Sequence, residues 1–285
     1  MICTWGGLLV AMGFDMPKFM KLMTLIGKAT PGEFMIIMGT AIAAFIISEP
    51  MENIKKTISY LGSLAKPASF SKSDYEELLC MLFSVFKLSK MKGWLALEAH
   101  IENPEESSLF GQFKSFHDNH HALIFLCDYL RIISLGNDDP GQISKLMDEE
   151  IGTLEHHEAA PGHSVQHMAD GIPALGIVAA VLGVIKTMSS INEPPEILGK
   201  MIGSALVGTF LGVWLSYAIV GPVAGAMTAR AETEVMYYKC MKVAVIAFLS
   251  GAAPQVAVEF ARKFLPHDLQ PSFQELEEKL NELPA

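Results

Sequence analysis

Charged residues are scarce in this chain of 285 residues: Asp, Glu, Lys and Arg together make up 18%, whereas 51% of the residues are hydrophobic. This balance and a mean hydropathy of +0.33 exclude an ordinary soluble domain and indicate that part of the chain lies in lipid. Basic residues are scarcer than acidic ones, 21 against 31, which gives a formal net charge of -10. Because binding to a phosphate backbone needs a cationic surface, nucleic acid is not an expected partner.

Cysteine is also scarce, and the motifs of several enzyme classes are missing. The four cysteines lie far apart, at positions 3, 80, 127 and 240, which fits reduced thiols and argues against a disulfide framework. No GxSxG, GxxxxGK[ST] or GxGxxG sequence occurs, so acyl transfer, nucleotide hydrolysis and dinucleotide binding have no basis in the sequence. We therefore expect a protein that is not an enzyme and carries no cofactor.

The nine histidines raise a membrane metalloenzyme as an alternative. Zinc needs three or four ligands that converge on one point, and no HExxH sequence provides them. The densest histidine segment contains Pro161 and Gly162, and its spacing places no three ligands on one helical face, so no metal site is expected. Its members are His156, His157, His163 and His167, with Glu155 and Glu158 beside them.

Four apolar runs are candidate membrane helices. Residues 201–229 carry no charged side chain, and at about 1.5 Å per residue they are longer than a hydrocarbon core about 30 Å thick. Residues 171–185 and 34–48 are shorter than the roughly 20 residues that a span needs, and residues 1–14 are shorter still. An upstream extension and a cleaved signal peptide are both open explanations for the short first run.

The polar regions between the runs carry helix signals. Ser73 with Glu76, and Ser272 with Glu275, have the spacing of a capping box, and Asp139 stands before a proline as at a helix start. Apolar residues follow at helical spacing, and no stretch alternates convincingly with period two. We therefore predict an all-α integral membrane protein with four transmembrane helices and a helical cytoplasmic domain.

Charge near the membrane ends orients these parts. Lys55, Lys56 and Arg230 flank the runs on the side of the large polar regions, which favours the cytoplasm for that side. The predicted organisation is residues 1–48 with transmembrane helices 1 and 2 and a short periplasmic loop, residues 49–169 as a cytoplasmic helical domain, residues 170–228 with transmembrane helices 3 and 4, and residues 229–285 as a cytoplasmic C-terminal helical region.

Two further features concern what the membrane helices can do. Small residues recur four positions apart, a spacing that lets helices in lipid approach closely, either within one chain or between chains. No Asp or Glu lies within any run, so a chain that moves protons needs a carboxylate from a partner. The small-residue pairs are Gly39 and Ala43, Ala179 and Gly183, Gly208 and Gly212, and Gly221 and Gly225.

Six segments of the sequence carry a resemblance to a known family. The segments PALGIVAAVLGV and GTFLGVWLSY lie in the third and fourth runs, and the other four lie in the polar regions. The six are DYLRIIS at 128–134, LMDEEI at 146–151, PALGIVAAVLGV at 173–184, GTFLGVWLSY at 208–217, APQVAVEFARK at 253–263 and PSFQELEE at 271–278. Together they resemble the MotA family, the membrane subunits of the bacterial flagellar stator.

The resemblance implies a function and a set of partners. It implies an ion-channel-forming subunit of the bacterial inner membrane. This subunit would form a homo-oligomer, a pentamer, around a MotB-like partner that supplies the membrane aspartate. Proton flow past this aspartate would then produce torque on the rotor protein FliG. The related ExbB or TolQ type of motor, which energises the outer membrane, is the alternative. The segment KMKGWLALEAHIENP at 90–104 favours the stator.

The resemblance also implies roles for single residues. Ala180 stands where sodium-driven relatives carry a threonine, and its lack of an oxygen ligand favours protons as the coupling ion. Lys90 and Glu98 match positions that engage the rotor, although the family residue at position 90 is usually Arg, whose planar fork Lys lacks. The residues implied for the ion pathway and its coupling are Pro173, Ala180, Thr209 and Pro222.

Overall fold

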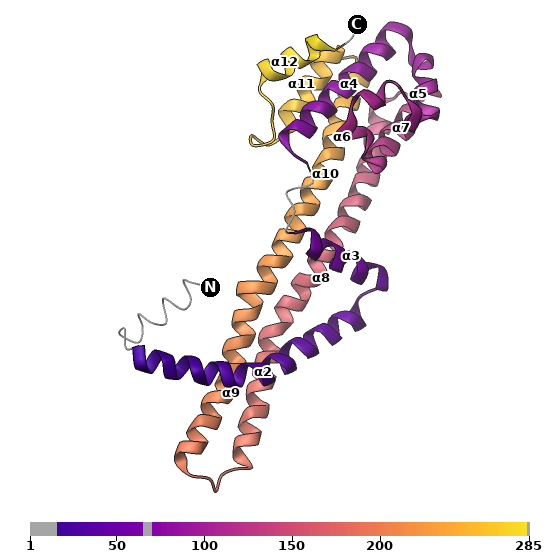
Figure 1. The fold of residues 1–285 in the computed structure, drawn as a ribbon. Helices are drawn as coiled ribbons and strands as arrows, with labels where there is room; N and C mark the ends of the chain where they lie inside the picture. Colours follow the sequence, from indigo (N-terminus) through magenta and orange to yellow (C-terminus); the bar gives the residue numbers. More distant parts are fainter. Residues whose placement is uncertain (1–15, 65–69, 284–285) are drawn as a thin grey trace. The chain divides into compact units, whose positions relative to one another are not determined.

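The computed structural model describes residues 16–64 and 70–283 (Figure 1). Every regular element among these residues is a helix, which confirms the all-α prediction for the described part of the chain. The first predicted membrane helix, residues 1–14, lies outside the described residues. The chain divides into two compact units. The membrane unit comprises Met1–Ala65 and Ala160–Thr228, and the globular unit comprises Lys66–Ala159 and Ala229–Ala285.

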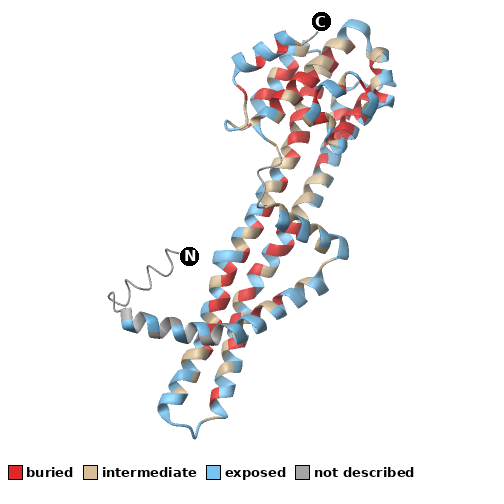
Figure 2. Ribbon diagram, in the orientation of Figure 1, coloured by how far each residue is buried: buried red, intermediate tan, exposed pale blue. Residues whose placement is uncertain are grey.

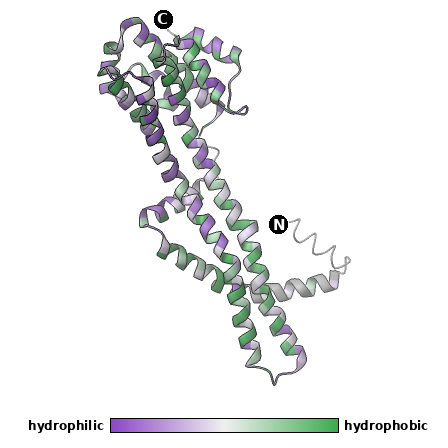
Figure 3. Cartoon of the chain, turned by 180° about the vertical axis from the view of Figure 1, so that it is seen from behind, coloured by the Kyte–Doolittle hydropathy of each residue, from purple (hydrophilic) through white to green (hydrophobic). Residues whose placement is uncertain are grey.

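The membrane unit is built from helices that are apolar over long stretches. Three helical stretches among the described residues are long and apolar enough to cross a membrane: Pro31–Ser48, part of Pro140–Met188 and part of Pro195–Leu249. Hydrophobic residues dominate α9 and the adjoining part of α8 in Figure 3. The helices of this unit are α2 (Met16–Ser48), α3 (Met51–Ser63), the later part of α8 (Pro140–Met188), α9 (Pro195–Leu215), the π-helical turn η4 (Ser216–Val220) and the start of α10 (Gly221–Leu249).

Burial in the membrane unit separates an inner side from an outer side. Ala179 on α8 and Leu211 on α9 are buried in the core of this unit. Large apolar side chains face outward instead, with Ile177, Val181 and Leu206 at least half exposed. Such side chains are stable in contact with lipid tails, so this pattern fits the predicted membrane location.

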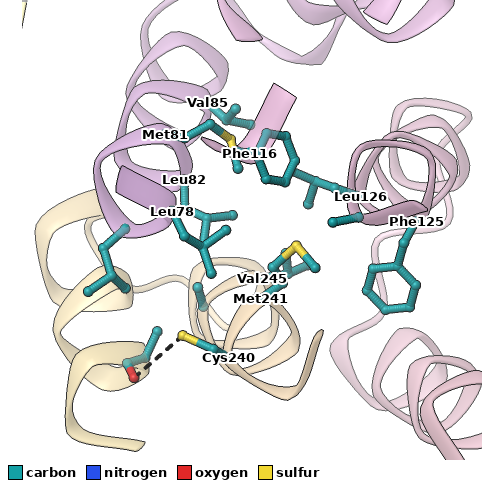
Figure 4. Close-up of a cluster of buried hydrophobic side chains, with 14 of the residues drawn as sticks. Leu78, Met81, Leu82, Val85, Phe116, Phe125, Leu126, Cys240, Met241 and Val245 are labelled. Atoms are coloured by element: carbon teal, nitrogen blue, oxygen red, sulfur yellow. Dashed lines mark hydrogen bonds between the residues drawn. The ribbon is translucent and has the colours of Figure 1, made fainter. Parts of the chain in front are cut away.

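The globular unit has its own hydrophobic core. Apolar side chains of α4, α7 and α10 meet there, with Leu82, Leu126 and Met241 fully or almost fully buried (Figure 4). Buried residues are dense in this unit in Figure 2. Its elements are α4 (Lys72–Lys92), η1 (Trp94–Leu97), α5 (Glu98–Glu102), η2 (Pro104–Glu106), η3 (Phe110–Gln112), α6 (Lys114–His117), α7 (His120–Ser134), the first part of α8, the later part of α10, α11 (Pro254–Phe264) and α12 (Phe273–Glu282).

Two of the three predicted helix starts are confirmed and one is wrong. Helix α12 begins after Ser272, whose hydroxyl accepts a hydrogen bond from the Glu275 amide at 3.2 Å. Helix α8 begins after Asp139, whose carboxylate accepts one from the Gly141 amide at 2.8 Å. The predicted start at Ser73 is wrong, because α4 is capped two residues earlier.

The true cap of α4 is formed by Ser71 and Asp74. The Asp74 carboxylate accepts a hydrogen bond from the Ser71 amide at 2.7 Å. Glu76, the acid expected in the capping box, is instead buried and pairs with Lys279 on α12. A serine followed three residues later by an acid thus occurs twice in this segment, as Ser71 with Asp74 and as Ser73 with Glu76. Asp74 forms the cap, whereas Glu76 is engaged by Lys279.

The two long helices α8 and α10 continue across predicted domain limits. Pro161 and Pro173 lie inside α8, which runs through both, and α10 runs through residues 228 and 229. The boundary between the two units divides α8 between residues 159 and 160. The apolar runs therefore mark where the sequence becomes hydrophobic and do not mark where helices end.

Candidate functional site

The candidate site begins with a close contact between α8 and α9. A Cβ atom on Gly176 would lie 2.9 Å from the Gly208 carbonyl oxygen, and one on Gly212 would lie 2.8 Å from the Gly176 Cα. These neighbours are backbone atoms that no rotamer change can move away. Further along the pair, a Cβ on Gly183 would lie 2.6 Å from the Ala205 Cβ. Only glycine fits at these positions, so the two helices touch backbone to backbone.

This contact uses two of the four predicted small-residue pairs. These are the pair Ala179 and Gly183 on α8 and the pair Gly208 and Gly212 on α9. For both pairs, the close approach occurs within one chain and not between chains. Gly39 and Gly225 have no neighbouring atom within 4 Å of an added Cβ. Gly221 would meet only the carbonyl oxygen of Ser216 in the adjoining π-helical turn.

Two predicted ion-pathway residues lie at the same level of this contact. A Cβ on Gly208 would lie 3.2 Å from the Ala180 amide nitrogen, so Ala180 lies beside the turn of α9 that carries Thr209. Both Ala180 and Thr209 are half-buried. The helix pair thus brings together an apolar position on α8 and a hydroxyl-bearing position on α9 from distant parts of the sequence.

The two predicted prolines occupy different helical surroundings. Pro173 is half-buried inside α8, next to Ile172, whose carbonyl oxygen lies 3.1 Å from the Cβ position of Gly212. Pro222 is exposed and directly follows η4 and Gly221. Because proline lacks an N–H and its ring collides with the carbonyl four residues before it, a wider π-helical turn is expected next to it. In this turn Ser216 Oγ donates a hydrogen bond to the Ala169 carbonyl oxygen of α8 at 2.7 Å.

Glu33 corrects the prediction that no acid lies within an apolar run. The helical stretch long enough to span starts at Pro31 and includes Glu33. Its Oε2 atom is buried with no hydrogen-bond partner among the described residues, and it lies 2.9 Å from the Cβ position of Gly208. Helix α2 packs on α9 here. The sequence held a signal for this placement, because Glu33 is four and eight residues before the buried Ile37 and Ala41.

Lys90 and Glu98 lie on the surface at either end of a short connection. Lys90 is in the last turn of α4, Glu98 opens α5, and Gly93 between them has a φ of 80°, which favours glycine. Trp94 packs edge to face on Phe248 at 5.8 Å. Neither charged side chain has an ion-pair partner among the described residues. The segment between them therefore packs on α10 through Trp94, while both charged side chains remain exposed.

Two neighbours of these charges were missed by sequence reasoning. Met91 is 65% exposed and Leu95 is 79% exposed, between Lys90 and Glu98 in the chain. Large apolar side chains this exposed, close together and flanked by charges, are typical of interaction surfaces. The helical phase was the available signal, since Leu97 and Ile101 are buried and leave Leu95 on the opposite side.

The histidine and cysteine predictions concern the globular unit and α8. Among the described residues, no group of three or more His, Cys, Asp or Glu side chains is arranged to hold a metal ion. Cys80, Cys127 and Cys240 are buried, free thiols, and Cys3 lies outside the described residues. Burial raises the pKa of the Cys80 thiol to about 11 and that of Cys127 to about 12, so both stay neutral and unreactive.

Comparison with known proteins yields two family matches. Residues 5–93 match the model of the motility protein A N-terminal domain, and residues 118–240 match the MotA/TolQ/ExbB proton channel family. Motility protein A of Salmonella typhimurium and that of Escherichia coli K12 are each 39% identical to this chain over 248 residues, which is 87% of this chain and 84% of theirs. The structure of the flagellar MotAB stator complex from Bacillus subtilis matches with a TM-score of 0.65 and 28% identity, over 83% of this chain and 84% of that chain.

An all-helical fold, spans of membrane length and a channel-family match together define a membrane protein of the proton-channel class, which is not an enzyme family. Within this class, the chain belongs to the motility protein A family and is an ion-channel stator subunit of the flagellar motor. The resemblance stated from six sequence segments is thereby confirmed. The N-terminal match and the motility proteins among the relatives favour the stator over the ExbB or TolQ type of motor.

Proposed function

We propose that this chain passes protons through the bacterial inner membrane together with a MotB-like partner and uses their flow to turn the rotor. The backbone contact between α8 and α9 carries this proposal. Because the two helices touch at Gly176 and Gly212, no path for an ion fits between them at this level. The path then runs along the outer side of the pair, against a helix of another chain.

The partner supplies the titrating carboxylate in this proposal. A group that binds and releases protons at membrane depth is needed, and such a group must face a water-accessible path. Glu33 does not serve, because its Oε2 atom is enclosed and lies against Gly208. In this proposal the aspartate of a MotB-like subunit lies near Thr209. The solved flagellar MotAB stator complex of Bacillus subtilis supports a MotB partner for this chain.

The assembly proposed is a pentamer of this chain around the partner helices. Each copy has four membrane helices in this proposal. The globular unit lies in the cytoplasm and contacts the rotor protein FliG through Lys90 and Glu98. A proton that crosses about 100 mV releases about 2.3 kcal/mol, so torque arises from many small steps.

Pro173 and Pro222 link proton binding to these steps. Neither side chain can titrate, so each acts through helix geometry. The π-helical turn before Pro222 and the Ser216 hydrogen bond to Ala169 tie the two helices together at one place. A helix with a weakened hydrogen-bond ladder can alternate between two packings at low cost, and protonation of the partner selects between them.

Motility of the source bacterium, with this chain as its only stator, tests the function and the coupling ion together. We expect swimming in sodium-free medium and arrest on addition of a protonophore, because Ala180 offers no oxygen ligand for a sodium ion. A strain that lacks the gene is the control and should not swim. Arrest on removal of sodium, with swimming that survives the protonophore, would overturn the proton assignment. Normal swimming of the strain without the gene, when no other stator gene is present, would overturn the stator function.

A further inference from the structure

A hydrogen bond between His100 and Ser107 lies next to the segment that carries Glu98. His100 is on α5, two residues after Glu98, and its side chain is half-buried. Its Nδ1 atom lies 2.9 Å from the Oγ atom of Ser107, which is buried between η2 and η3. Helix α5 has only 5 residues, so few contacts hold it in place. The stator function proposed above does not use this bond.

The other partners of Ser107 decide which atom donates in this bond. The amides of Leu109 and Phe110 both donate to Ser107 Oγ, each at 3.2 Å. A hydroxyl group has two acceptor positions and one hydrogen to donate, so both of its acceptor positions are occupied. Ser107 therefore donates its hydrogen to His100, and Nδ1 of His100 accepts it. The form of His100 that makes this bond is the neutral imidazole with its hydrogen on Nε2.

A proton on His100 disrupts this arrangement. Both ring nitrogens of an imidazolium ion are donors, so Nδ1 would then need an acceptor. Ser107 Oγ can accept from Nδ1 only if it releases one of the two amides, and it is too buried for water to replace the lost bond at no cost. Imidazole changes its charge between about pH 8 and 5. The bond is thus present while the ring is neutral and is lost as the pH falls through this range.

The charged groups around α5 do not bind the His100 ring. Helix α5 packs on η1, η2 and α7, and η1 carries no charged side chain. On α7, Arg131 pairs with Glu102 at 2.9 Å, and on η2, Glu105 lies 3.3 Å from His120. Ser107 is the one side chain bonded to the His100 ring among the described residues. The charged groups on these elements and on α5 itself are Glu98, Glu102, Glu105, Glu106, Asp128 and Arg131.

We propose that His100 and Ser107 form a pH-sensitive latch on α5. While His100 is neutral, the latch is closed and holds α5, with Glu98, to the turn between η2 and η3. When His100 gains a proton, the latch opens and α5 loses this support. The effect of the latch on motility rests on the proposed contact of Glu98 with the rotor, whereas the latch itself does not. A fall in cytoplasmic pH thereby weakens the rotor contact.

Hydrogen exchange of the full-length protein in lipid nanodiscs tests the latch. The exchange rates of the Leu109 and Phe110 amides, corrected for the intrinsic effect of pH, should rise about two- to tenfold from about pH 8 to 5, as expected for the loss of one hydrogen bond. In His100→Asn the Oδ1 atom can replace Nδ1 as acceptor and does not titrate, so this rise should disappear. His120→Asn is the control, because it removes a titrating histidine beside Glu105 and should keep the rise.

Torque at high load separates the latch from the proposed rotor contact. A permeant weak acid such as benzoate lowers the cytoplasmic pH, and we expect a smaller loss of torque in cells with His100→Asn than in cells with the unchanged chain. Exchange in the unchanged protein that does not rise at low pH, or an equal rise in His100→Asn, would overturn the latch. Equal loss of torque in both strains, with the exchange difference present, would support the latch and overturn its effect on the rotor contact.

Discussion

The carboxylate of Glu275 makes both a capping hydrogen bond and an ion pair at the start of α12. Its Oε2 atom accepts a hydrogen bond from the Ser272 amide at 2.7 Å and pairs with Lys72 of α4 at 2.7 Å. The Lys72 hydrogen bond first, and the Ser272 amide second, lower the pKa of Glu275 from 4.5 to about 2. The pKa of Glu275 is lower in the folded chain than in the unfolded chain. The stabilisation from these contacts is therefore fully present above about pH 4.5 and is lost as the pH falls toward 2.

We predict that Glu275→Gln loosens α12 at neutral pH. The neutral amide loses the charge that both contacts favour, so the helix start should open more often. Hydrogen exchange of the α12 amides should become faster, and the dependence of local stability on pH between about 4.5 and 2 should weaken. Glu278→Gln on the same helix is the control, since Glu278 is exposed. Equal exchange in the two variants would contradict the assigned contacts.

Glu33 marks a limit of what could be predicted at the residue scale. The absence of charge predicts the membrane helices, and by this criterion the second run begins at residue 34 and leaves Glu33 outside it. The structure buries one carboxylate oxygen because Gly208 has no side chain at the point of contact. Helical phase places Glu33 on the same side of α2 as the buried Ile37 and Ala41. The space that encloses its carboxylate, however, belongs to a helix far along the sequence, which local phase does not reveal. The surface positions of Lys90 and Glu98, by contrast, follow from helical phase alone.

At the scale of elements, the helices were predicted better than their limits. Runs without charged residues located the three candidate spans after the first run, although two of these runs were shorter than a span needs. The caps gave the starts of α8 and α12. The continuity of α8 through Pro161 and Pro173 was not predicted, because each proline removes one backbone hydrogen bond. The helix continues because packing holds the turns on both sides of each proline. Val165, Ala169 and Ile172 are buried between the two prolines and supply that packing.

The glycine contact between α8 and α9 gives a prediction at this scale. Gly176→Ala should destabilise the purified chain by about 1–3 kcal/mol, because the added methyl group meets backbone atoms of α9. Gly171→Ala on the same helix is the matched control, since no atom lies within 4 Å of its added Cβ. Both substitutions gain about 1 kcal/mol of helix propensity, so their difference reports the collision.

Thermal unfolding in detergent measures this difference. For a chain of this size we expect Gly176→Ala to melt about 2–4 °C below Gly171→Ala for each kcal/mol of destabilisation. Gly171→Ala should melt at or slightly above the unchanged protein. If the two variants melt together, α8 and α9 do not touch at Gly176 in the protein.

At the scale of the whole molecule, composition and family resemblance predicted the class of protein. They did not predict the apolar side chains of the proposed rotor surface. The resemblance implied only the charges Lys90 and Glu98, yet exposed ion pairs contribute about 0–1 kcal/mol each. Met91 and Leu95 are largely exposed in the same segment, and complete burial of a leucine contributes about 1.5–3 kcal/mol. If this surface meets the rotor, the apolar side chains supply most of the affinity and the charges supply orientation.

We therefore predict that Leu95→Ala slows swimming more than the single neutral substitution Lys90→Ala. The measurement is swimming speed and torque at high load in cells with equal amounts of the stator in the membrane. Leu135→Ala is the control, because Leu135 is 82% exposed at the end of α7 and loses the same side chain. We expect normal swimming from this control. Normal swimming of Leu95→Ala together with arrest of Lys90→Ala would show that the rotor contact is electrostatic, with no contribution from Leu95.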